Sequence, residues 1–195
     1  MKKILISGFD PFGGEKINPS FEAVKLLPDT IGECELIKIE LPTVFSRAAE
    51  IMTEKIEEIR PDAVICVGQA GGRRGITPEV IGINLREASI TDNAGNMPKN
   101  ESIRADAPDG IFSTLPIREM VEAIKAEGLT ASLSFSAGAF VCNDLLYSLL
   151  HQFKDTNIKI GFIHVPFLPE QAKDGVPSMT LSEITRGLSA AIECL

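Results

Sequence analysis

The stretch ASLSFSAGAFVCNDLLYSLL, residues 131–150, decides both the fold and the candidate site. Apolar and small residues alternate over Ala131–Phe135 and predict a short buried strand, Ser136-Ala137-Gly138 predicts a tight turn, and the apolar run from Phe140 predicts a helix. Cys142 then lies in the first turn of that helix, where unpaired backbone N–H groups and the helix dipole favour the thiolate. This arrangement presents a nucleophile, but free Cys is also among the most buried residue types, so a structural cysteine is the alternative.

Length and composition limit the class of protein. The 195 residues suit one domain, residues 1–195, with a core large enough to fold without disulfides or metal ions, and no linker divides it. Lys plus Arg number 19 and Asp plus Glu number 27, which gives a net charge of −8. This acidity argues against nucleic acid or an anionic membrane as the main partner.

The N-terminal stretch and the cysteines indicate a compartment. The first apolar stretch stops at Gly8, too early for a signal peptide, and no apolar run approaches the ~20 residues of a membrane helix. The four cysteines are far apart and form no CxxC motif; they are Cys34, Cys66, Cys142 and Cys194. We therefore expect a cytoplasmic protein whose cysteines are free thiols.

The apolar pattern predicts strands that alternate with helices over most of the chain. Further predicted strands are Lys3–Phe9, Cys34–Leu41, Ala63–Val67, Val80–Leu85 and Ile158–Val165. Predicted helices are Asn18–Leu27, Phe45–Arg60, Pro116–Gly128 and Thr180–Leu195, and a long loop is expected over Asp92–Gly110. This order predicts an α/β fold, a single-domain α/β/α sandwich whose twisted central sheet is mainly parallel, partly mixed and flanked by helices.

The carboxyl edge of this sheet is where a ligand is expected, because ligands gather there in open α/β sheets. The loops that should converge at this edge follow Phe9, Val67, Phe135 and His164. The loop over residues 68–75 is rich in glycine and arginine and allows a phosphate site, but it matches neither GxGxxG nor GxxxxGK[ST]. The rings of Phe9 and Phe12 suit either the core or a small apolar pocket.

Two histidines are candidate partners for the cysteine. His164 lies near the end of a predicted strand at the ligand edge, whereas His151 lies where the Cys142 helix ends and is expected to be partly solvated. An imidazole at the edge can accept a thiol proton, which favours His164, although a core histidine is the other interpretation. Among 27 acidic side chains, Glu79 between Pro78 and an apolar run is placed to be partly buried and to orient the imidazole.

Several blocks of sequence carry a resemblance to a known family. They are GFDPFGG (8–14), NPS (18–20), VGQAGG (67–72), FSTLPI (112–117), FIHVPFLPEQ (162–171) and the cysteine segment from Ser134 to Asn143. Over nearly its whole length the chain resembles pyroglutamyl peptidase I, the pyrrolidone-carboxylate peptidase family of cysteine peptidases. The resemblance implies an enzyme that removes an N-terminal pyroglutamyl residue from peptides, without a metal or cofactor.

The resemblance also implies roles for individual residues. The family's catalytic Cys, His and Glu fall on Cys142, His164 and Glu79, with a thioester acyl-enzyme as the intermediate. The residues implied to bind the lactam are Gln69, Phe9, Phe12, Thr43, Ile90, Phe140 and Val141. A lactam has an apolar ring, one N–H and one carbonyl, so an aromatic pocket with one hydrogen-bonding loop suits it. The resemblance further implies a homo-oligomer, a tetramer.

Some positions depart from the family pattern. Val80 stands where a basic residue is usual, Gly82 replaces Ala, Ser89 and Thr91 replace Arg and Pro, and Asp144 replaces His. Two alternatives stay open. These departures motivate one, an impaired member that binds N-terminally blocked peptides without turnover. The glycine- and arginine-rich loop motivates the other, a phosphate- or nucleoside-binding α/β enzyme that uses residues 71–75.

Overall fold

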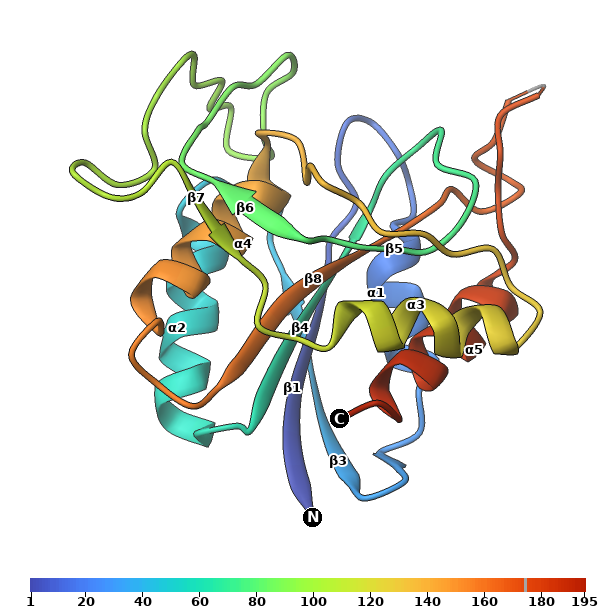
Figure 1. Ribbon diagram of the computed structural model, residues 1–195. Helices are drawn as coiled ribbons and strands as arrows, with labels where there is room; N and C mark the ends of the chain where they lie inside the picture. The colour runs from blue at the N-terminus through green and yellow to red at the C-terminus, as the bar shows by residue number, and fades with distance from the viewer. Residues whose placement is uncertain (174) are drawn as a thin grey trace.

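The computed structural model describes residues 1–173 and 175–195, which form an α/β/α sandwich (Figure 1). The strands are β1 (Lys2–Phe9), β2 (Thr30–Ile31), β3 (Cys34–Leu41), β4 (Ala63–Gln69), β5 (Thr77–Pro78), β6 (Ile81–Ile83), β7 (Gly110–Phe112) and β8 (Lys159–Val165). The central sheet has the order β2-β3-β1-β4-β8-β5, and β6 pairs with β7 separately. Strands β3, β1, β4 and β8 are parallel, whereas β2 and β5 add antiparallel edges, as the predicted mixed sheet requires.

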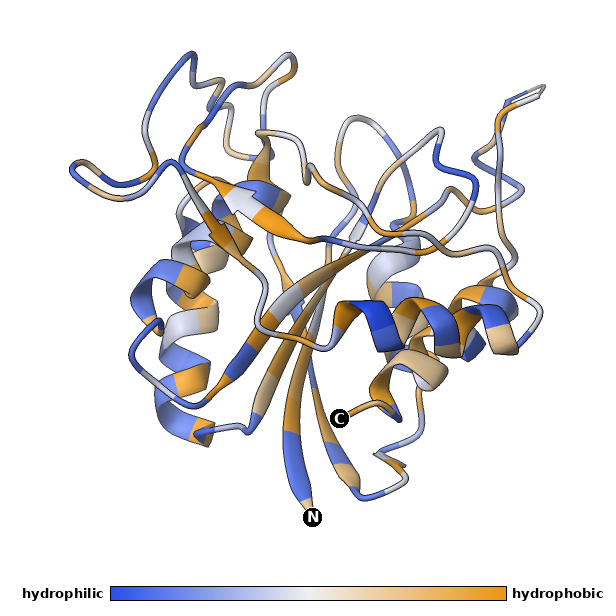
Figure 2. Cartoon of the chain, in the orientation of Figure 1, coloured by the Kyte–Doolittle hydropathy of each residue, from blue (hydrophilic) through white to orange (hydrophobic). Residues whose placement is uncertain are grey.

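Helices cover both faces of the central sheet. They are α1 (Pro19–Leu26), α2 (Arg47–Ile59), α3 (Ile117–Ala126), α4 (Val141–Gln152) and α5 (Leu181–Ile192). In Figure 1, α2 and α4 lie on one face and α1, α3 and α5 on the other. Side chains of β1 alternate between two cores, with Ile4 and Ile6 on the α1 side and Leu5 on the α2 side. Burial on both faces explains the mostly apolar runs in β1, β4 and β8 (Figure 2).

Most of the predicted elements are present within a few residues of their predicted bounds. The predicted capping box forms at the start of α5, where the Thr180 side chain accepts from the Glu183 N–H and Glu183 accepts from the Thr180 N–H. Asn18 caps α1 with a single bond, its side chain accepting from the Ser20 N–H. Helix α2 begins at Arg47 rather than Phe45, because Ser46 has a positive φ of 61°.

The predicted strand over Ala131–Phe135 is wrong as a regular strand. The segment does run beside residues 76–80, and hydrogen bonds join Ser132 N–H to the Ile76 carbonyl at 3.2 Å and Ser134 N–H to the Pro78 carbonyl at 3.0 Å. Pro78 has no N–H to return the next bond of this parallel ladder, so only isolated bridges remain.

The short strands β2, β5 and β7 were not predicted, because two or three residues carry too little pattern. The strand predicted over Val80–Leu85 is present only as β6, and residues 92–109 form the expected long loop. In the ranges that the structure describes, no helix is long and apolar enough to cross a membrane.

Candidate active site

The pairing of β4 with β8 determines which side chains meet at the carboxyl edge. Gly68 lies opposite His164 and Cys66 lies opposite Phe162, so these four residues face the same side of the sheet. Cys66 and Phe162 belong to the core beneath α2 and α4, which places His164 on the side of α4 as well. The rings of Phe162 and His164 are in contact, with centroids 4.7 Å apart.

Gly68 makes room for the sulfur of Cys142, and its importance was missed in the sequence. A Cβ atom on Gly68 would lie 2.6 Å from Phe162 Cζ and 3.0 Å from Cys142 Sγ. Only glycine at position 68 therefore allows the sulfur to lie against β4. Gly68 pairs with His164 of β8, so the sulfur lies at the level of His164.

Glu79 and His164 form a buried hydrogen-bonded pair. Glu79 follows β5, and its N–H donates to the Phe162 carbonyl at 2.8 Å, which fixes its backbone against β8. His164 Nδ1 lies 2.7 Å from Glu79 Oε1, and the two residues are 3% and 0% exposed. With Glu79 ionised, Nδ1 carries the proton and donates it to the carboxylate, which leaves Nε2 free to accept a proton.

The start of α4 presents Cys142 beside this pair. Gly138, with φ of 77°, makes the tight turn that was predicted, and its N–H donates to Ser136 Oγ at 3.2 Å. No side chain caps the start of α4 at Phe140, so backbone N–H groups of the first turn remain available. Within the described residues no hydrogen bond joins Cys142 to His164; in enzymes without substrate such bonds are often long.

Burial sets the direction of the pKa shift at Cys142 and His164, but not at Glu79. It raises the pKa of Cys142 to about 12, helped by the charge of Glu79 and opposed by Arg73. At Cys142, burial thus outweighs the pull toward the thiolate that the start of α4 exerts. Burial also lowers the pKa of His164, against Glu79, which raises it. For Glu79 burial acts to raise the pKa, but His164, Ser134 and Arg73 together lower it.

Arg73, which the sequence placed in a possible phosphate loop, points into this site instead. Its Nη1 donates to Glu79 Oε1 at 2.7 Å and also to the Thr77 hydroxyl, and its Nη2 donates to the Ser136 carbonyl at 3.0 Å. These internal bonds leave Arg74 as the exposed arginine of the loop. The phosphate alternative thus loses one of the two charges that motivated it.

Aromatic rings lie side by side next to the start of α4. The ring of Phe140 packs edge to face on Phe45 with centroids 5.1 Å apart, and it lies 6.0 Å from the ring of Phe12. Ile90 is 46% exposed and extends over the same loop as Phe12, since a Cβ on Gly13 would lie 3.8 Å from Ile90 Cδ1. Three of the residues implied to bind the lactam, Phe12, Ile90 and Phe140, thus belong to neighbouring segments.

Other implied binding residues lie deeper. Thr43 is held by Asp10, whose carboxylate accepts from the Thr43 N–H at 2.7 Å and whose carbonyl accepts from its hydroxyl at 3.2 Å. Phe9 and Val141 are 2% and 0% exposed and belong to the core beneath α4. The structure therefore places Phe9 in the core, with its ring centroid 6.3 Å from that of Phe162, rather than on an open surface.

Gln69 is held at the end of β4 by a residue that the sequence did not single out. Gln171 Nε2 donates to Gln69 Oε1 at 3.0 Å and to the Ile17 carbonyl at 3.1 Å. In turn Gln171 Oε1 accepts from the Leu168 N–H at 3.1 Å. The side-chain carbonyl of Gln69 is thereby occupied by Gln171, and its NH₂ group remains as a hydrogen-bond donor.

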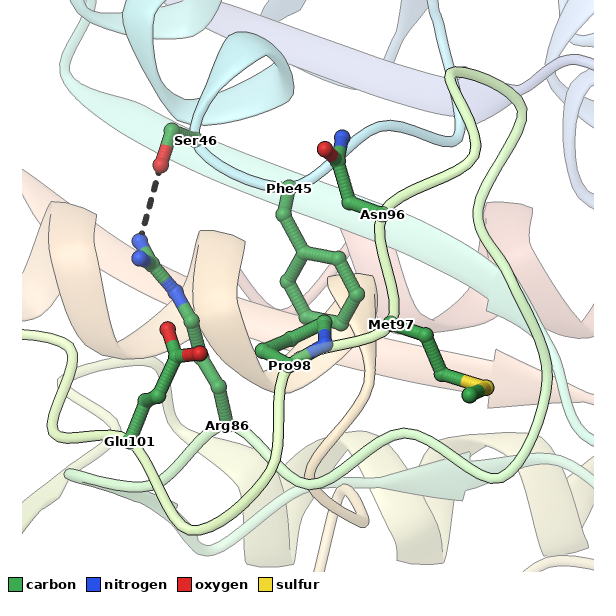
Figure 3. A pocket seen from close by; sticks show the side chains of 7 residues that line it. All are labelled: Phe45, Ser46, Arg86, Asn96, Met97, Pro98 and Glu101. Carbon is green, nitrogen blue, oxygen red and sulfur yellow. Dashed lines mark hydrogen bonds between the residues drawn. The ribbon is translucent and has the colours of Figure 1, made fainter.

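Residues after Cys142 fasten α4 to neighbouring segments. The Asn143 amide bonds both the N–H and the carbonyl of Ile83 in β6. Asp144, one of the departures, is fully buried; its Oδ1 accepts from Arg86 at 2.7 Å and its Oδ2 from the Ser46 N–H at 2.7 Å. Arg86 also donates to the Ser46 hydroxyl, as Figure 3 shows, and lines a cavity of about 360 Å³ that Phe45 borders. The lining of this cavity includes neither Cys142 nor His164.

Comparison with known proteins finds relatives that match nearly the whole chain. The model of the family described as pyroglutamyl peptidase matches residues 2–195. The chain is 54% identical to a pyrrolidone-carboxylate peptidase of Streptococcus suis, covering 97% of this chain and 90% of that one, and 53% identical to that of Lactobacillus acidophilus, covering 98% and 97%.

Solved structures give the same result for the fold. Pyroglutamyl peptidase I from Bacillus amyloliquefaciens superposes with a TM-score of 0.96 at 46% identity, covering 99% of this chain and 94% of that one. Pyrrolidone carboxyl peptidase from Thermococcus litoralis gives 0.95 at 36% identity, covering 100% and 93%. By sequence and by fold, this chain belongs to the pyroglutamyl peptidase family.

Proposed function

We propose that this protein is a cysteine-type omega-peptidase that hydrolyses the bond after an N-terminal pyroglutamyl residue, with Cys142 as nucleophile, His164 as base and Glu79 as the group that orients His164. The observation that carries the proposal is the buried 2.7 Å hydrogen bond between Glu79 and His164 at the level where Gly68 admits the Cys142 sulfur. A base that is held by a carboxylate next to a nucleophile is the arrangement that acyl transfer requires.

The proposed reaction starts from a neutral thiol, because burial raises the pKa of Cys142. As the sulfur attacks the carbonyl carbon, Nε2 of His164 takes the thiol proton and the imidazolium is stabilised by Glu79. The tetrahedral oxyanion accepts hydrogen bonds from free N–H groups at the start of α4, where one such donor contributes about 3 to 4 kcal/mol in other enzymes.

The intermediate then collapses. His164 returns the proton to the leaving amine, the C–N bond breaks and a pyroglutamyl thioester remains on Cys142. Water, deprotonated by His164, attacks the thioester, and the proton returns to the sulfur as free pyroglutamate leaves. No group of the enzyme is consumed, so the neutral Cys142 thiol and the neutral His164 imidazole are restored.

Recognition of the lactam is proposed to divide between apolar and polar groups. The rings of Phe12 and Phe140 with Ile90 supply a small apolar surface for the five-membered ring, which Phe9, Thr43 and Val141 support from beneath. We expect the NH₂ group of Gln69, whose carbonyl accepts from Gln171, to donate to the lactam carbonyl. A charged α-amine would lose solvation at this surface, which favours the neutral lactam over proline.

The direct test compares a pyroglutamyl amide with the matching prolyl amide, each carrying the same chromophoric amine. We expect wild type to release amine from the lactam substrate only, and Cys142→Ser to release none. Release from both substrates by wild type would refute the assigned specificity. Release by Cys142→Ser at the wild-type rate would refute the assigned nucleophile.

We also propose that the protein assembles as a homo-oligomer, a tetramer, as its resemblance to the family implies. Large apolar side chains at its surface support this, since Phe112, Phe135 and Met97 are 68%, 67% and 49% exposed. Light scattering at assay concentration tests it, and a monomer mass would refute it.

A further inference from the structure

We propose that Arg73 is a positioning residue of this active site, whose guanidinium ties the Glu79 carboxylate to the turn that leads into the nucleophile helix. The inference rests on the proposed function of Glu79, His164 and Cys142. It concerns a residue whose role in the reaction does not follow from the sequence, where Arg73 is one of two adjacent arginines in a glycine-rich loop.

The first observation is that Arg73 shares an acceptor with the imidazole. Oε1 of Glu79 accepts from Arg73 Nη1 at 2.7 Å and faces His164 Nδ1 at the same distance. Two donors that converge on one oxygen fix the direction of the carboxylate more narrowly than one donor does. Because Glu79 is fully buried, water does not supply the second donor.

The second observation is that the other end of the same guanidinium is bound to a different element. Nη2 donates to the Ser136 carbonyl at 3.0 Å, and the hydroxyl of Ser136 accepts from the Gly138 N–H in the turn before α4. Nη1 also donates to Thr77 in β5. One rigid, planar group thus spans β5, the carboxylate and the turn that sets the entry of the Cys142 helix, which the single ammonium of a lysine could not do.

The charge of Arg73 acts on the same groups. Those around the Glu79 carboxylate are His164 from β8, Cys142 from α4 and Arg73 itself, with Cys66 of β4 near Cys142. Arg73 contributes to lowering the pKa of Glu79, His164 and Cys142. Loss of this charge should therefore move the acid limb of kcat/KM, which reports protonation of His164, to higher pH.

The test uses Arg73→Met, which removes charge and fork, Arg73→Lys, which keeps the charge, and Arg74→Met as the matched control on the exposed neighbour. For Arg73→Met we expect kcat on the pyroglutamyl amide to fall on the order of 10- to 100-fold, with a smaller change in KM and an upward shift of the acid limb. Arg73→Lys should restore the position of the limb but only part of kcat. Arg74→Met should match wild type.

A second measurement does not need substrate turnover. The rate at which iodoacetamide alkylates Cys142 is followed against pH in the same variants, and we expect its acid limb to move as that of kcat/KM does. If wild type hydrolyses no pyroglutamyl amide, the proposed function fails while the alkylation profile still tests Arg73. Wild-type kcat and an unmoved limb in Arg73→Met would overturn the inference. Should Arg73→Met not fold, wild-type kcat in Arg73→Lys would overturn it equally.

Discussion

Two buried carboxylates, Glu79 and Asp144, are each paired with a partly exposed arginine, yet the structure uses them differently. Both carboxylates are fully buried, and the distances to Arg73 and Arg86 are 2.7 Å in each pair. In Asp144 both oxygens are occupied, one by Arg86 and the other by the Ser46 N–H. In Glu79 one oxygen serves Arg73 and His164, and Oε2 has no partner that meets hydrogen-bond geometry among the described residues.

The difference shows that the other hydrogen-bond partners of a paired carboxylate, rather than the ion pair itself, decide the role of that carboxylate. Both oxygens of Asp144 are occupied by a guanidinium and a backbone N–H, so Asp144 holds the start of α4 to the start of α2. Glu79 faces an imidazole that gains and loses a proton in each cycle of the proposed reaction. We therefore assign scaffolding to the first pair and chemistry to the second.

The largest expected effect is the loss of activity in Glu79→Gln. The neutral amide no longer stabilises the imidazolium or fixes its tautomer, so kcat/KM should fall on the order of 10³- to 10⁴-fold. The free energy of unfolding, measured in urea, should change far less than this. A variant that keeps a tenth or more of wild-type kcat/KM would remove Glu79 from the chemistry.

Asp144→Asn should show the reverse pattern. Removing the charge leaves Arg86, only 19% exposed, without its counter-ion, so the free energy of unfolding should fall by about 3 kcal/mol. Below the melting temperature kcat/KM should stay within about tenfold of wild type. A double-mutant cycle with Arg86→Met measures the coupling of the pair. An unchanged free energy of unfolding, or a loss of activity as large as in Glu79→Gln, would break the comparison.

The pH dependence separates the two pairs by sign. The hydrogen bond and charge of Glu79 raise the pKa of His164, so Glu79→Gln should lower that pKa and move the acid limb of Cys142 alkylation to lower pH. Asp144→Asn should leave the limb in place. Because Arg73→Met is expected to move it upward, the two variants at the Glu79 pair shift in opposite directions. Shifts in the same direction would contradict this placement of charges.

The smallest effect is expected at Gly82, which lies on the scaffold side in β6. A Cβ there would lie 3.1 Å from the Tyr147 nitrogen and 3.2 Å from Leu146 Cγ of α4, a crowded but not blocked position. In Gly82→Ala this crowding should offset the gain from a less flexible unfolded chain, so the free energy of unfolding should change by less than about 1 kcal/mol. A fall in the free energy of unfolding above about 2 kcal/mol would show that α4 cannot shift to accommodate the added methyl group.

The sequence predicted those features that depend on local pattern. The strands β1, β3, β4 and β8 follow from their apolar runs, and the start of α5 follows from the spacing of Thr180 and Glu183. The break at Pro78 was visible in principle, but its effect depends on which segment lies beside it. Pairing across the fold determines that neighbour, so periodicity within Ala131–Phe135 could not show it.

The candidate site divides in the same way. Position on a strand end favoured His164, and the structure brings it to Glu79 as expected. Arg73 is 63 residues from Ser136 in the sequence, and Asp144 is 58 residues from Arg86. No local spacing reveals such contacts. The raised pKa of Cys142 could not be predicted for the same reason, because the helix dipole is a local property whereas burial of Cys142 is a tertiary one.

Trapping the acyl-enzyme tests the central claim most directly. Wild type, Glu79→Gln and Cys142→Ser are mixed with the pyroglutamyl amide and quenched in acid within the first turnover, and the intact protein and its peptides are weighed by mass spectrometry. We predict one added pyroglutamyl group, on the peptide that contains Cys142, in wild type and more slowly in Glu79→Gln, and none in Cys142→Ser. Amine release by wild type without any such adduct, or with the adduct on another residue, would contradict the account.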